Sequence, residues 1–247
     1  MDQVDAMLRF LDDILADAYA ASGMVRVEPE HRVPGNAFVP VGRGHAPDVA
    51  FPRGGVMVLG QDFGNERDLE AVIAAREETD VVPTWREIGK ALIGAEIPPE
   101  GCWRTNYVMG VRRGSKSNCG RSPGLRRGAL RCACRELFVR QVRAQEPCAV
   151  VVLGTHVPVA LAVDFPCAFG AWREKSFSRR DLKNGAAMRD VNVDGVTVPL
   201  IVSILHPSMC GPNLWRRQFD GQDGAEAEWS LLRLVSDMVR ERWTAPT

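Results

Sequence analysis

The chain has 247 residues, enough for one large domain, and its composition of 45% hydrophobic and 25% charged residues is that of an ordinary globular protein. Collagen-like, disordered and coiled-coil classes are thereby excluded. The 31 basic residues balance the 31 acidic ones, so net charge alone gives no argument for a nucleic-acid partner. No apolar run approaches the roughly 18 residues of a membrane span, and the first residues lack the positive charge of a signal peptide. We therefore expect a cytoplasmic protein without a membrane partner.

The amino-terminal part combines a helix with a long loop. Residues 3 to 21 carry apolar side chains at spacings of three and four, which predicts one amphipathic helix that stops before Gly23. Residues 26 to 54 contain five prolines and several glycines, which predicts a long loop. Too little chain precedes this loop to form a domain of its own. We therefore expect one domain over residues 1–247, with residues 1–54 as its extension.

Apolar runs alternate with helical patterns over the rest of the chain. We predict buried strands at residues 56–59, 103–108, 149–153 and 198–205. We predict helices at residues 66–78, 84–95, 128–144, 156–163 and 223–242, and a hairpin over residues 187–197 around Asp194-Gly195. Strands that alternate with helices indicate an α/β domain with a mostly parallel sheet.

Polar residues follow or end several of the predicted strands. Asp62 comes directly after the first run, Asn106 lies within the second, and His206 follows the last. Ligands of open parallel sheets bind outside the carboxyl ends of the strands, so a carboxylate, an amide and an imidazole are expected in one crevice. Each residue also has a structural explanation. Asp62 could cap the next helix, Asn106 could satisfy buried backbone groups, and His206 could lie in an ordinary loop.

The order of these residues carries a resemblance to a known family. Gly60-Gln61-Asp62, Asn106, the segment CAVVVLG at residues 148–154, and His206-Pro207-Ser208 resemble the ordered motifs of the uracil-DNA glycosylase superfamily. Residues 82–88 resemble its proline-rich DNA-contacting turn and helix. The resemblance covers about residues 55–216. It implies a three-layer α/β/α fold with a central, mostly parallel four-stranded sheet.

The resemblance implies hydrolysis of the bond between uracil, or a related deaminated base, and its sugar in DNA, which leaves an abasic site. Asp62 would position the attacking water and stabilise the positive sugar, and His206 would donate a hydrogen bond to the departing base. Asn106 would read the edge of uracil and reject cytosine. Further contacts to the base are expected from Gln61, Phe63 and Gly64, with Phe63 or Trp85 stacking on it.

The sequence departs from the family at the residues after the aspartate. The uracil-specific branch has Pro-Tyr there, and its tyrosine blocks a 5-methyl group, whereas this chain has Phe63-Gly64. We therefore expect the pocket to accept a wider range of bases than uracil alone.

A basic segment predicts the surface that meets DNA. Residues 101–135 hold nine basic residues and no acidic one, which favours a phosphate-facing loop with Arg112, Arg113, Arg126 and Arg127. Thr84 and Ser208 are expected to contact DNA because of the resemblance. After His206, Leu214 or Met209 is expected to insert into the duplex, with Arg216 and Arg217 on phosphates. The structural alternative is that Leu214 and Trp215 pack beneath the loop.

No cofactor or metal is expected, and we expect a monomer. Relatives with an iron–sulfur cluster use four cysteines, two of them near the amino terminus, whereas this chain has none before Cys102. Its seven cysteines are expected to be buried thiols.

Two other functions remain open. The chain could bind damaged DNA on the same scaffold without turnover or by covalent trapping, or it could bind nucleotides, although Gly60-x-x-x-Gly64 is neither a dinucleotide fingerprint nor a P-loop.

Overall fold

A five-stranded sheet forms the centre of the protein. The computed structural model describes residues 3–14, 16–28, 31, 52–76, 81–114, 120–174, 176–183, 185–207 and 210–244. The strand order is β3-β2-β5-β7-β6. Four of these strands are parallel: β2 (Val56–Gly60), β3 (Cys102–Asn106), β5 (Ala149–Leu153) and β7 (Val196–Ile204). Strand β6 (Ala187–Val193) is antiparallel to β7.

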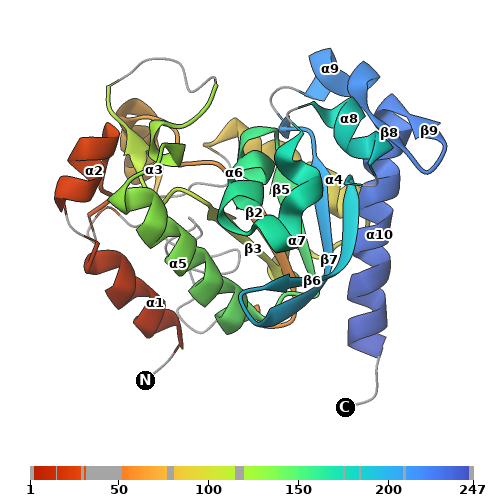
Figure 1. Ribbon diagram of the computed structural model, residues 1–247, viewed down its shortest axis with the longest axis horizontal. Coiled ribbons are helices and arrows are strands. Elements are labelled where there is room, and N and C mark those ends of the chain that lie inside the picture. Colours follow the sequence, from red (N-terminus) through yellow and green to blue (C-terminus); the bar gives the residue numbers. More distant parts are fainter. Residues whose placement is uncertain are drawn as a thin grey trace.

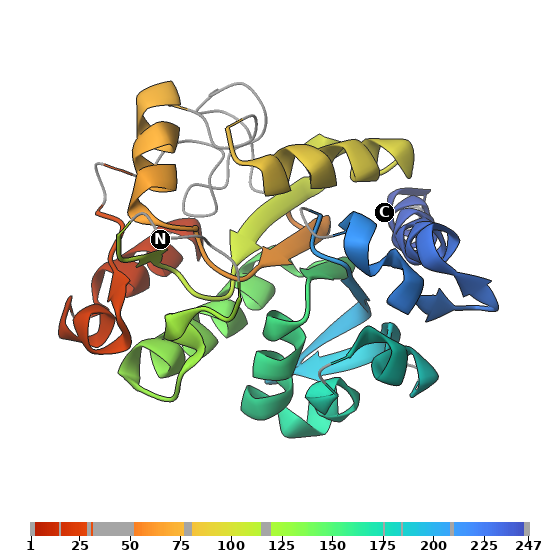
Figure 2. The same ribbon diagram turned by 90° about the horizontal axis from the view of Figure 1, so that it is seen from above.

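Helices cover both faces of the sheet, as Figures 1 and 2 show. One face carries α1 (Gln3–Asp12), α2 (Ala16–Ser22), α5 (Ala129–Gln145), α6 (His156–Asp164) and α7 (Pro166–Phe169). The other face carries α4 (Pro83–Gly94) and α10 (Gly224–Thr244). Alternate residues of β2 belong to the two core clusters, Met57 and Leu59 to the first and Val56 and Val58 to the second. Burial on both faces explains the continuous apolar runs, and the predicted three-layer α/β/α class is confirmed.

The sheet has one strand more than the four expected. The predicted hairpin does turn at Asp194-Gly195, where both residues have positive φ angles of 51° and 90°. Its first arm is β6, which stays paired with β7 from Val193↔Val196 to Ala187↔Val202. The arm is therefore too long to be a local hairpin and becomes an antiparallel edge strand of the main sheet.

The predicted helix over residues 3–21 is two helices. Helix α1 ends at Asp12 and α2 begins at Ala16. The turn between them lets Tyr19 become buried, and its hydroxyl donates a hydrogen bond to the Met109 carbonyl at 2.9 Å. The apolar spacing continues across the break because Leu11 and Ile14 are both buried, so the sequence pattern does not reveal it.

The remaining elements are short or flank the sheet. Helix α3 (Glu66–Ala75) follows β2, and α8 (Phe177–Leu182) and α9 (Cys210–Asn213) lie on either side of the β6–β7 hairpin in sequence. Single 3-10 turns are η2 (Pro99–Gly101), η3 (Pro123–Leu125), η4 (Gly170–Arg173) and η6 (Leu214–Arg216). Two small antiparallel sheets join β1 (Met24–Val25) to β4 (Val111–Arg112) and β8 (Gln218–Phe219) to β9 (Gln222–Asp223).

Most of the predicted proline-rich loop at residues 26–54 lies outside the described residues. Within the part of the chain that the structure describes, no helix combines the length and apolar character needed to cross a membrane.

Candidate active site

The four parallel strands end at one edge of the sheet and bring four polar side chains there. Asn106 ends β3, and its strand partner Gly60 ends β2 two residues before Asp62. His156 follows β5, and His206 follows β7. The neighbouring ends of β5 and β7 are joined by a hydrogen bond of 2.9 Å from the Gly154 N–H to the Ile204 carbonyl. This is the position at which open parallel sheets bind ligands.

Both oxygens of the Asp62 carboxylate are engaged. Oδ1 accepts a hydrogen bond from the Gly64 N–H at 3.3 Å, and Oδ2 accepts one from Arg112 Nε at 2.7 Å. The Asp62 side chain is only 5% exposed. The helix cap considered as an alternative for Asp62 is made by Asn65, which forms a reciprocal capping box with Asp68. Asp62 is therefore a buried carboxylate at the strand end and not a helix cap.

Arg112 belongs to this site and not to the exposed surface that the sequence led us to expect. Its guanidinium is 11% exposed and bonds Asp62, while Nη2 donates to the Gly120 carbonyl at 3.0 Å. Its backbone N–H donates to the Gly64 carbonyl at 2.8 Å, so β4 lies against the turn that carries Asp62. This main-chain contact turns the side chain inward and explains the difference.

Asn106 is a buried amide whose donor is unused. Among the described residues its Nδ2 has no hydrogen-bond partner, although the side chain is almost fully buried. Its Oδ1 lies directly over Gly60, because a Cβ atom at Gly60 would be 2.3 Å from that oxygen and 3.3 Å from the Trp85 ring. The amide therefore does not simply satisfy backbone groups. A buried donor without a partner is costly and points to a ligand atom at this position.

The two histidines of the site favour the neutral form. Burial lowers the pKa of His206, and the nearby Asp62 carboxylate opposes this shift. Burial also lowers the pKa of His156, with further lowering by Arg121 and Arg112. The Asp62 carboxylate raises the pKa of both histidines, so both imidazoles lie near it.

Sequence reasoning did not select His156. The signal that identifies it is its position directly after a buried strand and a glycine, Gly154, whose φ of +75° turns the chain at the sheet edge.

The residues around Asp62 have separate tasks. Gln61 Nε2 donates to the Gly120 carbonyl at 3.1 Å and Oε1 accepts from the Ser122 N–H at 3.2 Å, so its side chain anchors that loop and is not free to contact a base. The two stacking candidates lie on opposite faces of the sheet, with Phe63 in the core beside α5 and Trp85 next to Asn106.

Gly64 has a φ of +79°, a conformation that other residues adopt only with strain. A tyrosine at position 64 would therefore strain this turn.

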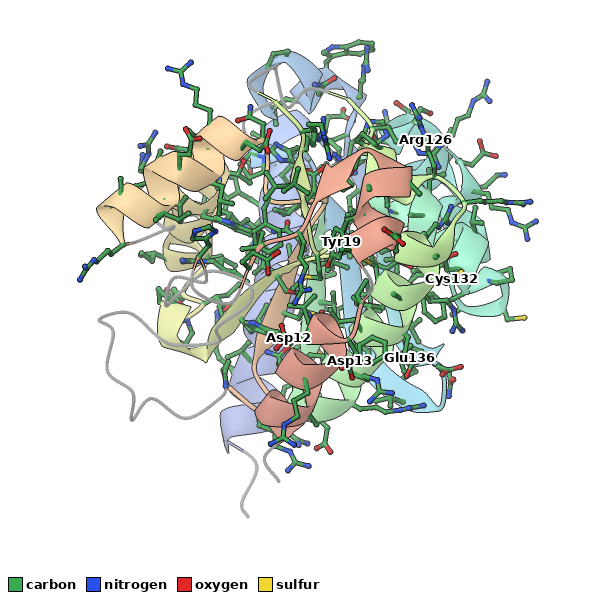
Figure 3. All side chains as sticks on the ribbon, turned by 90° about the vertical axis from the view of Figure 1, so that its left-hand side faces the viewer. Asp12, Asp13, Tyr19, Arg126, Cys132 and Glu136 are labelled. Atoms are coloured by element: carbon green, nitrogen blue, oxygen red, sulfur yellow. The ribbon has the colours of Figure 1, made fainter. Side chains whose placement is uncertain are left out.

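The other arginines of the basic segment that were predicted to contact DNA are accessible. Arg113, Arg126 and Arg127 are exposed, and Thr84 is partly exposed in the first turn of α4. Figure 3 shows Arg126 toward the end of the molecule where the parallel strands end, whereas the acidic Asp12, Asp13 and Glu136 lie toward the other end. The basic segment thus contains two buried arginines, Arg112 in the site and Arg131 paired with Asp164, besides the exposed ones.

The segment after His206 contains a strongly exposed aromatic ring. Ser208 and Met209 lie outside the described residues, and Leu214 is partly buried. Trp215 is 74% exposed, so it does not pack beneath the loop, and the guanidinium of the exposed Arg216 stacks 4.7 Å from its ring centroid.

The expectation that Arg217 contacts phosphate is wrong. Arg217 is fully buried because Asp181 and Glu228 form ion pairs with it in the interior.

The cysteines divide between the core and the surface. Cys134 and Cys148 are buried, whereas Cys132 and Cys167 are exposed, which corrects the expectation that all the thiols are buried. Over the described ranges, no three His, Cys, Asp or Glu side chains gather closely enough to hold a metal ion.

Comparison of the chain with protein-family models finds no match, and comparison with curated proteins finds none of significant similarity.

Proposed function

We propose that this protein is a monofunctional DNA glycosylase of the uracil-DNA glycosylase type, which hydrolyses the N-glycosidic bond of uracil or a related deaminated base. The observation that carries the proposal is the position of Asp62, Asn106 and His206 at the same edge of the parallel sheet, with the Asn106 amide donor buried and unused. An uncommitted buried donor suits recognition of a carbonyl oxygen on an extruded base.

The residue types fit the charge changes of glycosidic hydrolysis. The sugar becomes positive and the departing base becomes negative, so the site has to stabilise charges of both signs. Asp62 supplies a fixed negative charge for the sugar and an acceptor for the attacking water. His206, kept neutral by burial, donates a hydrogen bond to the carbonyl oxygen of the base as that oxygen gains charge. Asn106 donates through Nδ2 to a second base atom and accepts through Oδ1.

Arg112 gives Asp62 a fixed orientation in this mechanism. The Nε–Oδ2 contact of 2.7 Å and the Gly64 N–H hold the carboxylate from two sides, so it is already oriented before a substrate arrives. We expect the exposed Arg113, Arg126 and Arg127 to neutralise backbone phosphates. Trp215 replaces Leu214 as the side chain that we expect to enter the duplex, because its ring is already exposed to solvent.

A second function is favoured by the same ion pair. A carboxylate whose two oxygens are both engaged is less available to a water molecule, so the protein could bind damaged DNA without releasing a base. In this non-catalytic function Asn106 would still bind the base and the exposed arginines would still bind phosphates, but Asp62 would take no part in turnover.

Labelled oligonucleotides that carry uracil, hypoxanthine, xanthine or a thymine mismatch separate the two functions. After incubation and alkali treatment, a glycosylase produces a cleaved strand, and Asp62→Asn abolishes this product while DNA binding remains. Asp237→Asn is the matched control, because Asp237 lies exposed on α10. Binding to damaged DNA with no cleaved strand from any of these substrates would favour the non-catalytic function, and neither binding nor cleavage would contradict both.

A further inference from the structure

A cluster of buried charged side chains lies beneath the chain segment that carries His206. Figure 1 shows α8, α9, α10 and the end of β7 together on one side of the molecule. At their meeting point Arg217 is fully buried, with Nε 2.6 Å from Glu228 Oε1 and Nη1 3.3 Å from Asp181 Oδ1. Arg217 Nη2 also donates to the Ser203 carbonyl at 2.9 Å. The second buried guanidinium, Arg180, donates to Ser203 Oγ at 2.8 Å.

Glu228 holds the chain at two separate points. Besides its ion pair with Arg217, its carboxylate accepts the Leu205 N–H, at 3.0 Å on Oε2 and 3.2 Å on Oε1. Leu205 directly precedes His206, and Arg217 directly follows the η6 turn that carries Trp215. A single side chain from α10 therefore fixes both ends of the connection that contains the candidate catalytic imidazole.

Stability alone does not explain such an arrangement. Buried ion pairs lose so much hydration that apolar residues of similar volume are often equally stabilising. What the Glu228 carboxylate does provide is a directional hydrogen bond from the Leu205 N–H together with a close charge contact to Arg217. Apolar packing would fill the same space and leave the backbone before His206 without this constraint.

We propose that Glu228 is a positioning residue for His206. Glu228 ties the Leu205 N–H and the Arg217 guanidinium to helix α10, and we call this pair of contacts the fastening. The inference rests on the proposed function for the role of His206, whereas the fastening itself is independent of any substrate. Outer partners of this kind orient the groups that touch a substrate, and a displacement of about 1 Å can cost a hundredfold in rate.

The charge state of this fastening changes near neutral pH. Burial raises the pKa of Glu228 to about 7, while Arg217 and the Leu205 N–H oppose the shift and Asp181 adds to it. Burial also raises the pKa of Asp181 and lowers that of Arg180 to about 10. Below about pH 7 the Glu228 carboxyl is protonated and its bond to Arg217 loses its ionic part.

NMR titration of the histidine side chains tests the fastening without a substrate. Glu228→Leu fills the same space and removes the acceptor of the Leu205 N–H. This change is felt whatever the protonation of the wild-type carboxyl, which is already neutral in the pH range in which His206 titrates. If Glu228 positions His206, the imidazole becomes more hydrated in this variant and its pKa rises, whereas loss of a nearby negative charge would lower that pKa. Glu226→Leu, at an exposed position on the same helix, should leave the His206 pKa unchanged. An unchanged or lower His206 pKa in Glu228→Leu overturns the proposal.

Turnover measurements test whether the effect passes through His206. We expect Glu228→Leu to lower kcat by about tenfold to a hundredfold with little change in KM. The double variant Glu228→Leu/His206→Ala should be no slower than His206→Ala alone, because the two side chains act as one unit. Losses that simply multiply would show a general structural role and overturn the proposal.

A second variant and a measurement without substrate keep the proposal testable if a variant misfolds or the protein shows no glycosylase activity. If Glu228→Leu does not fold, Glu228→Asp keeps the charge but is too short to reach both partners, and it should raise the His206 pKa in the same way. If the wild-type protein cleaves none of the oligonucleotides, the proposed function fails, and the NMR titration still decides whether Glu228 positions the imidazole.

Discussion

The two halves of the candidate site are held in place by different means. On the β2–β3 side, Asp62 is fixed by Gly64 in its own turn and by Arg112, whose backbone bonds that turn. On the β5–β7 side, the backbone before His206 is fixed by Glu228, a side chain from α10. Both halves contain a buried ion pair, but Arg112 bonds the candidate catalytic carboxylate itself, whereas Glu228 bonds only the backbone before the imidazole. A change in one half should therefore leave the other intact.

The largest effect is expected at Asp62. Asp62→Asn should lower turnover on uracil-containing DNA by about a hundredfold or more and leave DNA binding largely unchanged, because the carboxylate acts on charge that develops in the transition state. Single-turnover rates and a binding titration measure the two quantities. The His206 pKa should fall slightly, since Asp62 raises it in the wild type. A near wild-type rate would remove Asp62 from the catalytic role.

Substitutions of exposed arginines should affect DNA binding, whereas substitution of the buried Arg112 should affect turnover. Replacing Arg113, Arg126 and Arg127 together with glutamine should weaken DNA binding by about tenfold or more, and each lost phosphate contact should reduce the slope of log affinity against log salt by about 1. Arg112→Gln should lower turnover instead and leave that slope unchanged, because its guanidinium is bound to Asp62.

The matched control for the triple variant replaces exposed arginines on α10, namely Arg233, Arg240 and Arg242. A reduced salt slope in this control, or an unchanged slope in the triple variant, would move the DNA-binding surface away from the residues of the triple variant.

A smaller effect is expected from one methyl group at Gly60. Gly60→Ala places a Cβ atom 2.3 Å from Asn106 Oδ1, so the carboxamide has to move while the strand keeps its pairing. Turnover should fall by about tenfold, and the His206 pKa should not change, because the damage stays on the β2–β3 side. Gly170→Ala is the control, since nothing lies within 4 Å of its added Cβ. Equal effects of the two variants on turnover would show that Asn106 does not need its observed position.

The smallest effect is expected from pH on the β5–β7 side. Burial lowers the pKa of His206, so the imidazole is still neutral when the pH falls through its ordinary value of about 6.5. The fraction of neutral His206, measured by NMR titration, should therefore change little between pH 7 and 6.5, and a loss of turnover in this range would come from protonation of Glu228. The unfolded chain binds this proton first, so His206 also makes the folded state less stable as the pH falls below about 6.5. A His206 titration midpoint at 6.5 or above would contradict the prediction.

The local patterns predicted most of the helices and parallel strands, and they placed Asp62, Asn106 and His206 at the strand ends. The DNA-glycosylase role of these residues remains a prediction. The hairpin at residues 187–197 is also confirmed, but two expectations failed for a clear physical reason. The helix over residues 3–21 breaks without any change in apolar spacing, and the sheet has five strands instead of four because the first arm of the hairpin continues along β7. Both outcomes depend on which surface the segment meets, and periodicity does not contain that information.

The sequence by itself determined which segments are buried and that polar side chains follow them, because these properties depend on residues close together in the chain. Only the tertiary structure decided how those side chains are used. Arg112 is a member of the site because β4 bonds the Asp62 turn, and Arg217 is buried because α8 and α10 bring carboxylates to it. In the sequence these two arginines look like their exposed neighbours Arg113 and Arg216. The contacts that distinguish them come from elements far apart in the chain, and burial makes those contacts strong.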